Sequence, residues 1–127
     1  MKRIVSKSTA EGRITPPTSK SVAHRMLIIA SLCNGETSTI RGITPGEDVL
    51  ATIECLSALG VKIDYQGDTA KVCGIDFSTA EPTEALNCRE SGSTLRFMIP
   101  LALLFGGTSE FYGTERLISR GVEVYRK

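Results

Sequence analysis

The sequence predicts an α/β (α+β) fold built from a repeated unit of strands and helices. Some segments alternate apolar and polar residues, as half-buried strands do, and others repeat apolar residues with the period of a helix. A faint internal repeat recurs after 71 residues, which indicates two copies of one unit. We expect the first copy over about residues 13–75 and a truncated second copy over about 84–127.

The first copy opens with two short strand-like segments, residues 3–6 and 12–15. Pro16 and Pro17 follow directly. Proline lacks an amide hydrogen and disfavours a helical residue before it, so these prolines should separate the strands from the next helix.

The next helix should begin after Thr18 or Ser19, because a hydroxyl side chain there can cap the first turn. We expect it to run to about Leu32 and to end at Gly35, which can adopt a positive φ. Helical spacing predicts an apolar stripe facing the core at Val22, Met26, Ile29 and Cys33, with Ala23, Leu27 and Ala30 beside it.

A strand over residues 36–42 and a second helix should follow. Thr44 and Glu47 have the spacing of a capping box, and Pro45 suits the first helical position. Apolar residues then recur at helical spacing as far as Leu59.

A β-hairpin over residues 61–65 and 70–74 should close the first copy. The second copy follows, and its Arg96 lies 71 residues after Arg25. The same offset joins the pairs Gly35–Gly106, Thr37–Thr108, Ser38–Ser109 and Gly42–Gly113. We expect the second copy to be cut short within residues 116–127.

Composition excludes several classes of protein. A net charge of +1 argues against general nucleic-acid binding, which usually needs a basic excess. The longest apolar run, Phe97–Phe105, contains Pro100 and is too short to span a bilayer, and the start of the chain has no apolar signal segment. The four cysteines have no metal-ligand spacing, so we expect free thiols, no metal and a cytoplasmic location.

Lys20, Ser21 and Arg25 form the first candidate site. A helix N-terminus attracts anions through its free amide groups and its dipole. Ser21 and Arg25 are four residues apart and can share one helix face. From these residues alone, a solvated polar edge and an anion site are equally good interpretations.

Two further candidates lie in the second copy. Ser91, Gly92 and Ser93 lead into a helix that carries Arg96, and a glycine there lets a ligand approach the backbone closely. Arg116 and Arg120 are also four residues apart, although a solvated helix face is the more common reason for such a pair.

Three stretches carry a resemblance to a known family: "PPTSKSVAHRMLIIASLCNGETSTIRG", "GEDVLATIECLSALGVKI" and "NCRESGSTLRFMIPLALLFGG". They resemble the N-terminal part of the 3-phosphoshikimate 1-carboxyvinyltransferase (EPSP synthase) family. The resemblance implies two domains, each of three βαβαββ units of the enolpyruvyl transferase fold. This chain would hold one complete and one incomplete unit, as a partial N-terminal domain without the C-terminal domain.

The resemblance also implies a reaction. The family transfers the enolpyruvyl group of phosphoenolpyruvate to the 5-hydroxyl of shikimate-3-phosphate, releases phosphate and needs no cofactor; glyphosate occupies its phosphoenolpyruvate site. The acid and base residues are expected outside this chain, which we therefore expect to be inactive alone. The implied partners are the missing remainder of the enzyme, or a second copy bound through exposed apolar surface.

The family's substrate contacts map onto five residues here. Lys20 would touch both substrates, Ser21 and Arg25 would bind shikimate-3-phosphate, and Gly92 and Arg120 would bind phosphoenolpyruvate. Supporting residues would be Arg96, Ser91, Ser93 and Arg116. The chain departs from the family pattern at Glu90, where many members have Asn, and at Gly121, where they have Pro.

Two alternatives remain open at this point. One is a fragment of a UDP-N-acetylglucosamine enolpyruvyl transferase, although its lysine is typically followed by Asn and here Ser21 follows Lys20. The other is a non-catalytic module that binds a phosphorylated metabolite or packs against a partner chain.

Overall fold

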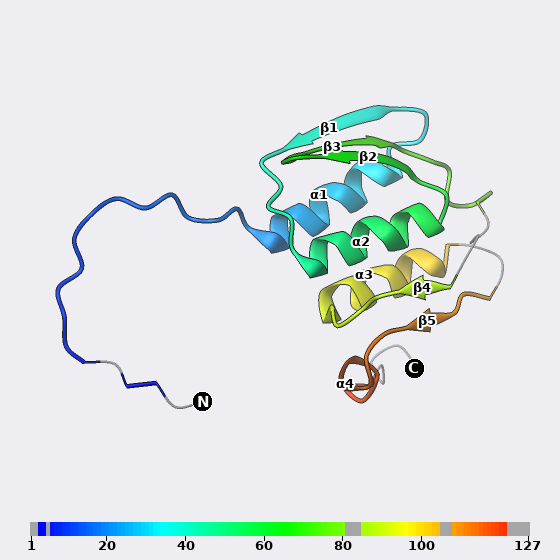
Figure 1. Ribbon diagram of the computed structural model, residues 1–127. Helices are drawn as coiled ribbons and strands as arrows, with labels where there is room; N and C mark the ends of the chain where they lie inside the picture. Colours follow the sequence, from blue (N-terminus) through cyan, green and yellow to red (C-terminus); the bar gives the residue numbers. More distant parts are fainter. Residues whose placement is uncertain (1–2, 5, 81–84, 105–107, 122–127) are drawn as a thin grey trace.

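Three helices lie between two small β-sheets (Figure 1). The computed structural model describes residues 3–4, 6–80, 85–104 and 108–121. In chain order the elements are α1 (Lys20–Leu32), β1 (Thr37–Arg41), α2 (Glu47–Ala58), β2 (Lys62–Gln66), β3 (Thr69–Cys73), β4 (Leu86–Asn87), α3 (Gly92–Ala102), β5 (Phe111–Tyr112) and α4 (Glu115–Ile118). The chain is thus a mixed α/β protein, as its sequence predicts.

Helix α1 has the predicted bounds. The Ser19 side chain caps it by accepting from the amide of Val22 at 3.4 Å. After the helix ends, Gly35 turns the chain with a φ of 75°, a conformation that suits glycine.

The core-facing side of α1 differs from the prediction. Val22, Met26 and Ile29 are 56%, 45% and 57% exposed, and Cys33 is exposed as well. The buried residues of the helix are Ala23, His24, Leu27, Ala30 and Ser31. The prediction is confirmed for Ala23, Leu27 and Ala30 and wrong for the other four residues of the stripe. Helix α2 and strand β3 pack on the neighbouring side of α1, where small and polar residues flank Leu27.

The strands predicted before Pro16 do not form. Residues 12–15, and residues 3, 4 and 6 of the other segment, lie in an exposed chain that projects from the body of the protein (Figure 1). Ile4 and Ile14 are both exposed. A strand needs a neighbouring strand to pair its amide and carbonyl groups, and the described residues bring none beside this segment.

The predicted hairpin is confirmed. Strands β2 and β3 pair antiparallel around Gly67, and β1 pairs antiparallel with the other edge of β3. The sheet order is therefore β1-β3-β2.

The predicted capping box before α2 is wrong. The N-cap is Gly46, which has no side chain to cap the helix. The hydroxyl of Thr44 instead lies 2.7 Å from that of Thr18. This side chain, which was expected to cap α2, therefore joins the segment before α2 to the segment before α1. Glu47 and Asp48 still favour the helix start electrostatically.

The segment predicted to be the second copy has shorter strands than the segment predicted to be the first. Strands β4 and β5 pair in parallel, and α3 connects them. Ser91 caps α3, and Thr114 caps the single turn of α4. One continuous core joins both copies, with fully buried side chains that include Leu27, Leu56, Leu86, Met98 and Leu117.

Two general expectations can be compared with this fold. All four cysteines are free; Cys55 and Cys88 are buried, whereas Cys33 is exposed. None of the helices in the described part of the chain is long and apolar enough to cross a membrane.

Candidate functional site

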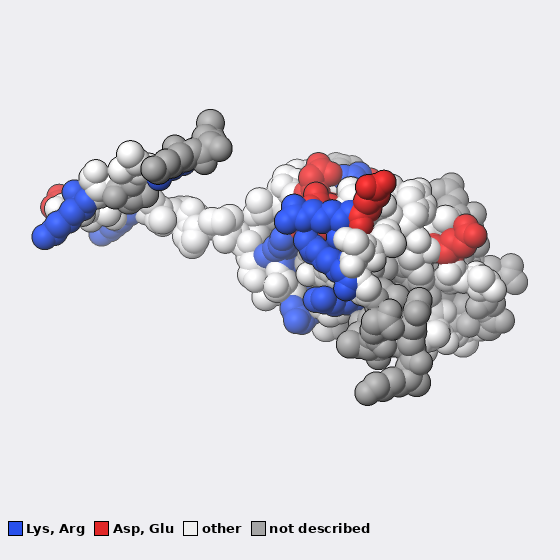
Figure 2. Space-filling view, turned by 90° about the horizontal axis from the view of Figure 1, so that it is seen from below, with Lys and Arg blue, Asp and Glu red and all other residues white. Residues whose placement is uncertain are grey.

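The first residues of three helices meet at one polar cavity of about 500 Å³. Lys20 begins α1, Glu47 and Asp48 begin α2, and Gly92 and Ser93 begin α3. Glu90, Arg96 and Arg120 complete the lining. Seen from below, Lys and Arg side chains form a band on this face, with Asp and Glu side chains beside it (Figure 2).

The backbone makes this cavity attractive to anions. The first turn of a helix leaves amide groups without carbonyl partners, and the helix dipole places partial positive charge there. Because α1, α2 and α3 all begin at the cavity, three such helix ends act on the same space. An isolated helix start is a weak sign of a ligand, but here it coincides with three basic side chains, Lys20, Arg96 and Arg120.

The fold brings together residues that the sequence placed in three separate candidate sites. Lys20 comes from the first, Gly92, Ser93 and Arg96 from the second, and Arg120 from the third. A carbon atom added at Gly92 in the Cβ position would lie 3.3 Å from Nη1 of Arg120. The absence of a side chain at Gly92 therefore lets the guanidinium group lie against the start of α3.

Ser21 and Arg25 do not line this cavity. Nη1 of Arg25 donates to the carbonyl of Ser21 at 2.8 Å. The guanidinium carbon lies 5.3 Å from the centre of the Phe97 ring, in a cation–π contact. Both residues are exposed on α1, next along the chain from Lys20.

Ser91 and Arg116 support the site from outside it. Ser91 is buried, and its hydroxyl accepts from the amide of Thr94 at 3.2 Å, which fixes the start of α3. Nη1 of Arg116 lies 3.1 Å from Oε1 of Glu90, an acidic residue of the cavity.

The three acidic residues of the cavity each have a basic partner. Asp48 pairs with Lys20, Glu47 pairs with Arg89, and Glu90 pairs with Arg116. The hydrogen bond from Lys20 holds the pKa of Asp48 below its ordinary value, and a bond from Ser91 acts in the same direction. Each acidic side chain of the cavity is thus offset by a basic partner, so the cavity can still accept an anion.

A buried polar chain fixes the three helix starts relative to one another. Nδ1 of His24 lies 2.7 Å from Oγ1 of Thr52, which lies 2.8 Å from Oγ1 of Thr94. Oγ1 of Thr94 also lies 2.8 Å from Oγ of Ser91 and donates to the carbonyl of Asp48 at 3.1 Å. Burial lowers the pKa of His24 and keeps its ring neutral in this chain of hydrogen bonds.

Sequence reasoning missed part of the site. The sequence indicates Glu47 only as part of a capping box, and nothing in its pattern indicates the ion pairs of Glu47 and Asp48. Arg89 was not singled out at all. Asn87, two residues earlier, is a turn-forming residue that could have drawn attention to it, since Oδ1 of Asn87 accepts from the amide of Arg89 at 2.9 Å.

Fold and site together define an α/β protein with a polar cavity where helix N-termini and basic side chains converge. Within the described residues, no three metal-ligating side chains are grouped as a metal site. Comparison with known proteins then identifies the family: the EPSP synthase (3-phosphoshikimate 1-carboxyvinyltransferase) family matches residues 4–124. The chain belongs to this family.

Individual relatives agree with the family match. The chain is 39% identical over 122 residues to a 3-phosphoshikimate 1-carboxyvinyltransferase of Clostridium beijerinckii and 40% identical over 127 aligned positions to that of Clostridium novyi. It spans only 28% and 29% of the length of these two proteins, while 91% and 93% of the chain is covered. A solved EPSP synthase from Acinetobacter baumannii matches with a TM-score of 0.79 and 28% identity, covering 88% of this chain and 25% of that one.

Proposed function

We propose that this chain supplies one wall of a substrate site for enolpyruvyl transfer. In that reaction phosphoenolpyruvate gives its enolpyruvyl group to the 5-hydroxyl of shikimate-3-phosphate, and EPSP and phosphate are formed. The observation that carries the proposal is the cavity in which Lys20, Gly92 and Arg120 meet, although they are up to 100 residues apart in the sequence.

Phosphoenolpyruvate is the substrate that this cavity suits. It carries a phosphate and a carboxylate, and the cavity offers a planar guanidinium fork at Arg120, a mobile ammonium at Lys20 and the amides at the start of α3. Arg96 and Ser93 add polar groups to the same wall. Lys20 would have to share its charge between Asp48 and the incoming anion.

Shikimate-3-phosphate is assigned to Ser21 and Arg25 on the strength of the family motif. Both residues are exposed and lie beside Lys20 on α1, so a phosphate group could contact all three from one side. For this, the Arg25 guanidinium must leave the carbonyl of Ser21.

The repeat organisation is part of the proposal. We assign the elements α1 to β3 to one βαβαββ unit and β4 to α4 to the beginning of a second unit. The parallel pair β4–β5, joined by α3, supports this assignment, because a βαβαββ unit would begin with strand, helix and strand. In the first unit the corresponding first strand does not form within the described residues.

The matched family favours the shikimate enzyme over the UDP-N-acetylglucosamine enzyme. A non-catalytic role for the 127 residues alone is compatible with the same cavity. An assay for the reaction therefore has to be separate from an assay for binding.

The binding test is a titration of the isotopically labelled chain with phosphoenolpyruvate, monitored at backbone amides. Weak but saturable binding should shift the amides of Gly92, Ser93 and Thr94. We expect millimolar affinity, because a partial site pays the full cost of ordering its ligand with few contacts. An Arg120→Gln variant should lose most of the shifts, and equal binding by this variant would contradict the assignment.

The activity test is a phosphate-release assay with both substrates. The chain alone should release no phosphate above the uncatalysed rate, because the described residues provide one wall and nothing that closes over the substrates. Substantial release by the pure chain would contradict this expectation.

A further inference from the structure

The geometry points to Arg89 as a positioning residue that keeps the cavity open to anions. It does so by fixing the turn before Gly92 and by pairing with Glu47, a carboxylate of the cavity wall. The inference deepens the proposed function, since it rests on the cavity being an anion site. Arg89 itself is outside the cavity lining and acts through its neighbours.

The backbone of Arg89 is in an unusual conformation. Its φ is 51°, and among the described residues it is the one non-glycine with a positive φ. Side chains other than glycine adopt this left-handed region at an energetic cost, so surrounding contacts must maintain it. The turn that it makes leads directly through Glu90 and Ser91 into Gly92.

Two hydrogen bonds of the Arg89 backbone maintain the turn. The amide of Arg89 donates to Oδ1 of Asn87 at 2.9 Å, and its carbonyl accepts from the amide of Thr114 at 2.8 Å. Gly113 packs so closely that an added Cβ would lie 2.5 Å from this carbonyl oxygen. The turn is therefore joined both to β4 and to the segment that enters α4.

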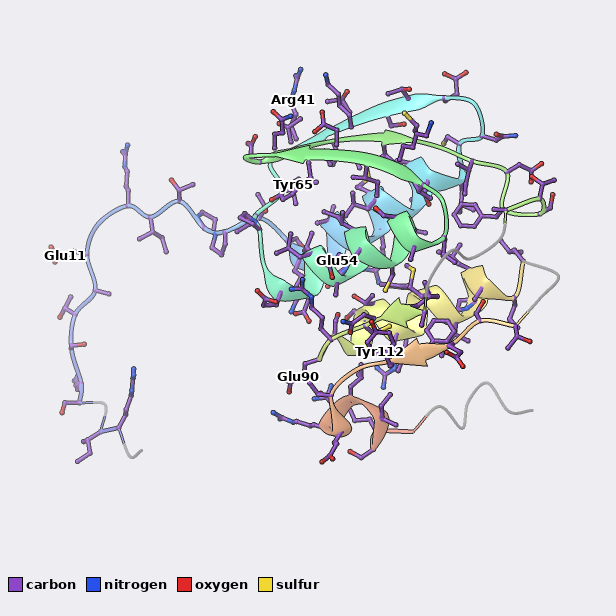
Figure 3. All side chains as sticks on the ribbon, turned by 45° about the vertical axis from the view of Figure 1, so that its right-hand side comes forward. Glu11, Arg41, Glu54, Tyr65, Glu90 and Tyr112 are labelled. Atoms are coloured by element: carbon purple, nitrogen blue, oxygen red, sulfur yellow. The ribbon has the colours of Figure 1, made fainter. Side chains whose placement is uncertain are left out.

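The guanidinium group of Arg89 joins the same turn to α2. Nε donates to Oε2 of Glu54 at 3.1 Å, and Nη2 pairs with the other oxygen of that carboxylate. Nη1 pairs with Oε2 of Glu47. Figure 3 shows Glu54 on α2 and Glu90 at the turn that precedes α3, so Arg89 spans the space between these two elements.

Of the two carboxylates that pair with Arg89, only that of Glu47 can affect a ligand in the cavity. Glu47 lines the cavity, and its side chain is 82% exposed. Glu54 is outside the lining. A bidentate pair with Glu54 would be enough to anchor the turn, whereas the third contact places positive charge on a carboxylate that would otherwise repel an anion.

The two contacts can be separated by substitution. Arg89→Gln removes both ion pairs and should weaken binding of inorganic phosphate by about two- to fivefold, the size expected for one exposed charge pair. Adding Glu47→Gln to Arg89→Gln should restore the affinity, because the unpaired carboxylate is then gone. Adding Glu54→Gln instead is the matched control and should restore nothing. Arg89→Lys keeps the charge and should stay near the parent affinity.

The experiment measures phosphate affinity of the 127-residue chain and these variants by amide shifts, together with their thermal unfolding. Restoration by Glu47→Gln alone supports the inference even where Arg89→Gln lowers the unfolding temperature. Four results would overturn the inference. Phosphate affinity could be unchanged in Arg89→Gln, or the parent chain could fail to bind phosphate. Alternatively, Glu54→Gln could restore the affinity as well as Glu47→Gln does, or neither substitution could restore it.

A parallel titration with phosphoenolpyruvate separates this result from the proposed function. If phosphoenolpyruvate binds no more tightly than phosphate, the proposed substrate assignment is weakened. The Arg89 inference would then still stand on the phosphate series.

Discussion

The two segments predicted to be copies of a repeat, here called the first and second copy, differ in what they contribute. The first, residues 20–73, has helices of 13 and 12 residues and strands of five. In the second, residues 86–118, α3 has 11 residues, but both strands have two residues and α4 has four. Yet the second copy provides Glu90, Gly92, Ser93 and Arg96 to the cavity, and Arg120 follows α4 directly.

The first copy is therefore mainly a framework, and the second is mainly a set of positioned ligand groups. Regular elements bury enough apolar surface to keep themselves in place. The second copy relies more on individual contacts, such as the Ser91 cap, the close approach at Gly113 and the ion pairs of Arg89. The following predictions test this division, from the largest expected effect to the smallest.

The largest effect should come from Leu27 in the framework. Leu27 is fully buried on α1, so Leu27→Ala should lower the free energy of unfolding by about 3 kcal/mol. Because one core joins both copies, denaturant unfolding should shift equally for amides of β3 and of α3. A shift confined to the first copy would break the comparison by showing that the second is independently stable.

Met26→Ala is the matched control on the neighbouring stripe. Met26 is largely exposed, so its loss should change the free energy of unfolding by about 0.5 kcal/mol or less. A loss as large as that of Leu27→Ala would mean that the exposed stripe is covered in solution.

An intermediate effect on stability is expected from the N-cap residues of α1 and α3, Ser19 and Ser91, which should differ in how much they stabilise the fold. Ser19→Ala removes a long 3.4 Å cap bond at an exposed site and should cost about 0.5 kcal/mol. Ser91→Ala removes a buried cap that also lies 2.8 Å from Oγ1 of Thr94, and should cost about 2 kcal/mol. If thermal unfolding shows the same loss of stability for both substitutions, α3 does not depend on its cap more than α1 does.

The smallest effect concerns acid stability. The folded-state pKa of Asp48 is lowered by Lys20, so its contribution to stability is present above the unfolded-state pKa of about 3.9. That contribution is lost as the pH falls through the lower folded-state pKa. Asp48→Asn should therefore cost about 0.5 kcal/mol at pH 7 and less at pH 3, below the unfolded-state pKa.

Glu90→Gln provides the comparison in the second copy. Its ion pair with Arg116 is more exposed than that of Asp48 with Lys20, so no change in stability is expected at either pH. An effect larger than that of Asp48→Asn would reverse the order of the two pairs.

The sequence predicted those features that depend on nearby residues. The bounds of α1 and the hairpin follow from local spacing, caps and turns. The sequence also singled out Lys20 and Gly92, which line the cavity, while their role in binding anions stays a prediction. The burial of His24 on α1 could not be predicted in the same way, because its hydrogen-bond partner, Thr52, comes from α2. Thr44 was misread for the same reason, since it bonds to Thr18 and not to its own helix.

Tertiary pairing also explains what was missed in the site. The sequence places Arg89 between a strand and a helix but gives no sign that Glu47 and Glu54 face it. The assignments of Ser21 and Arg25 rest on motif and remain predictions. Neither residue lines the cavity, and the Arg25 side chain bonds to the backbone carbonyl of Ser21 and stacks on Phe97.

The convergence of α1, α2 and α3 at one cavity has a consequence for how such a site can evolve. The attraction for negative charge comes partly from backbone groups, which no side-chain substitution removes. Side chains around the cavity can then be exchanged one at a time while some affinity for anions persists. The fold thereby provides a starting point from which recognition of different acidic metabolites can diverge gradually.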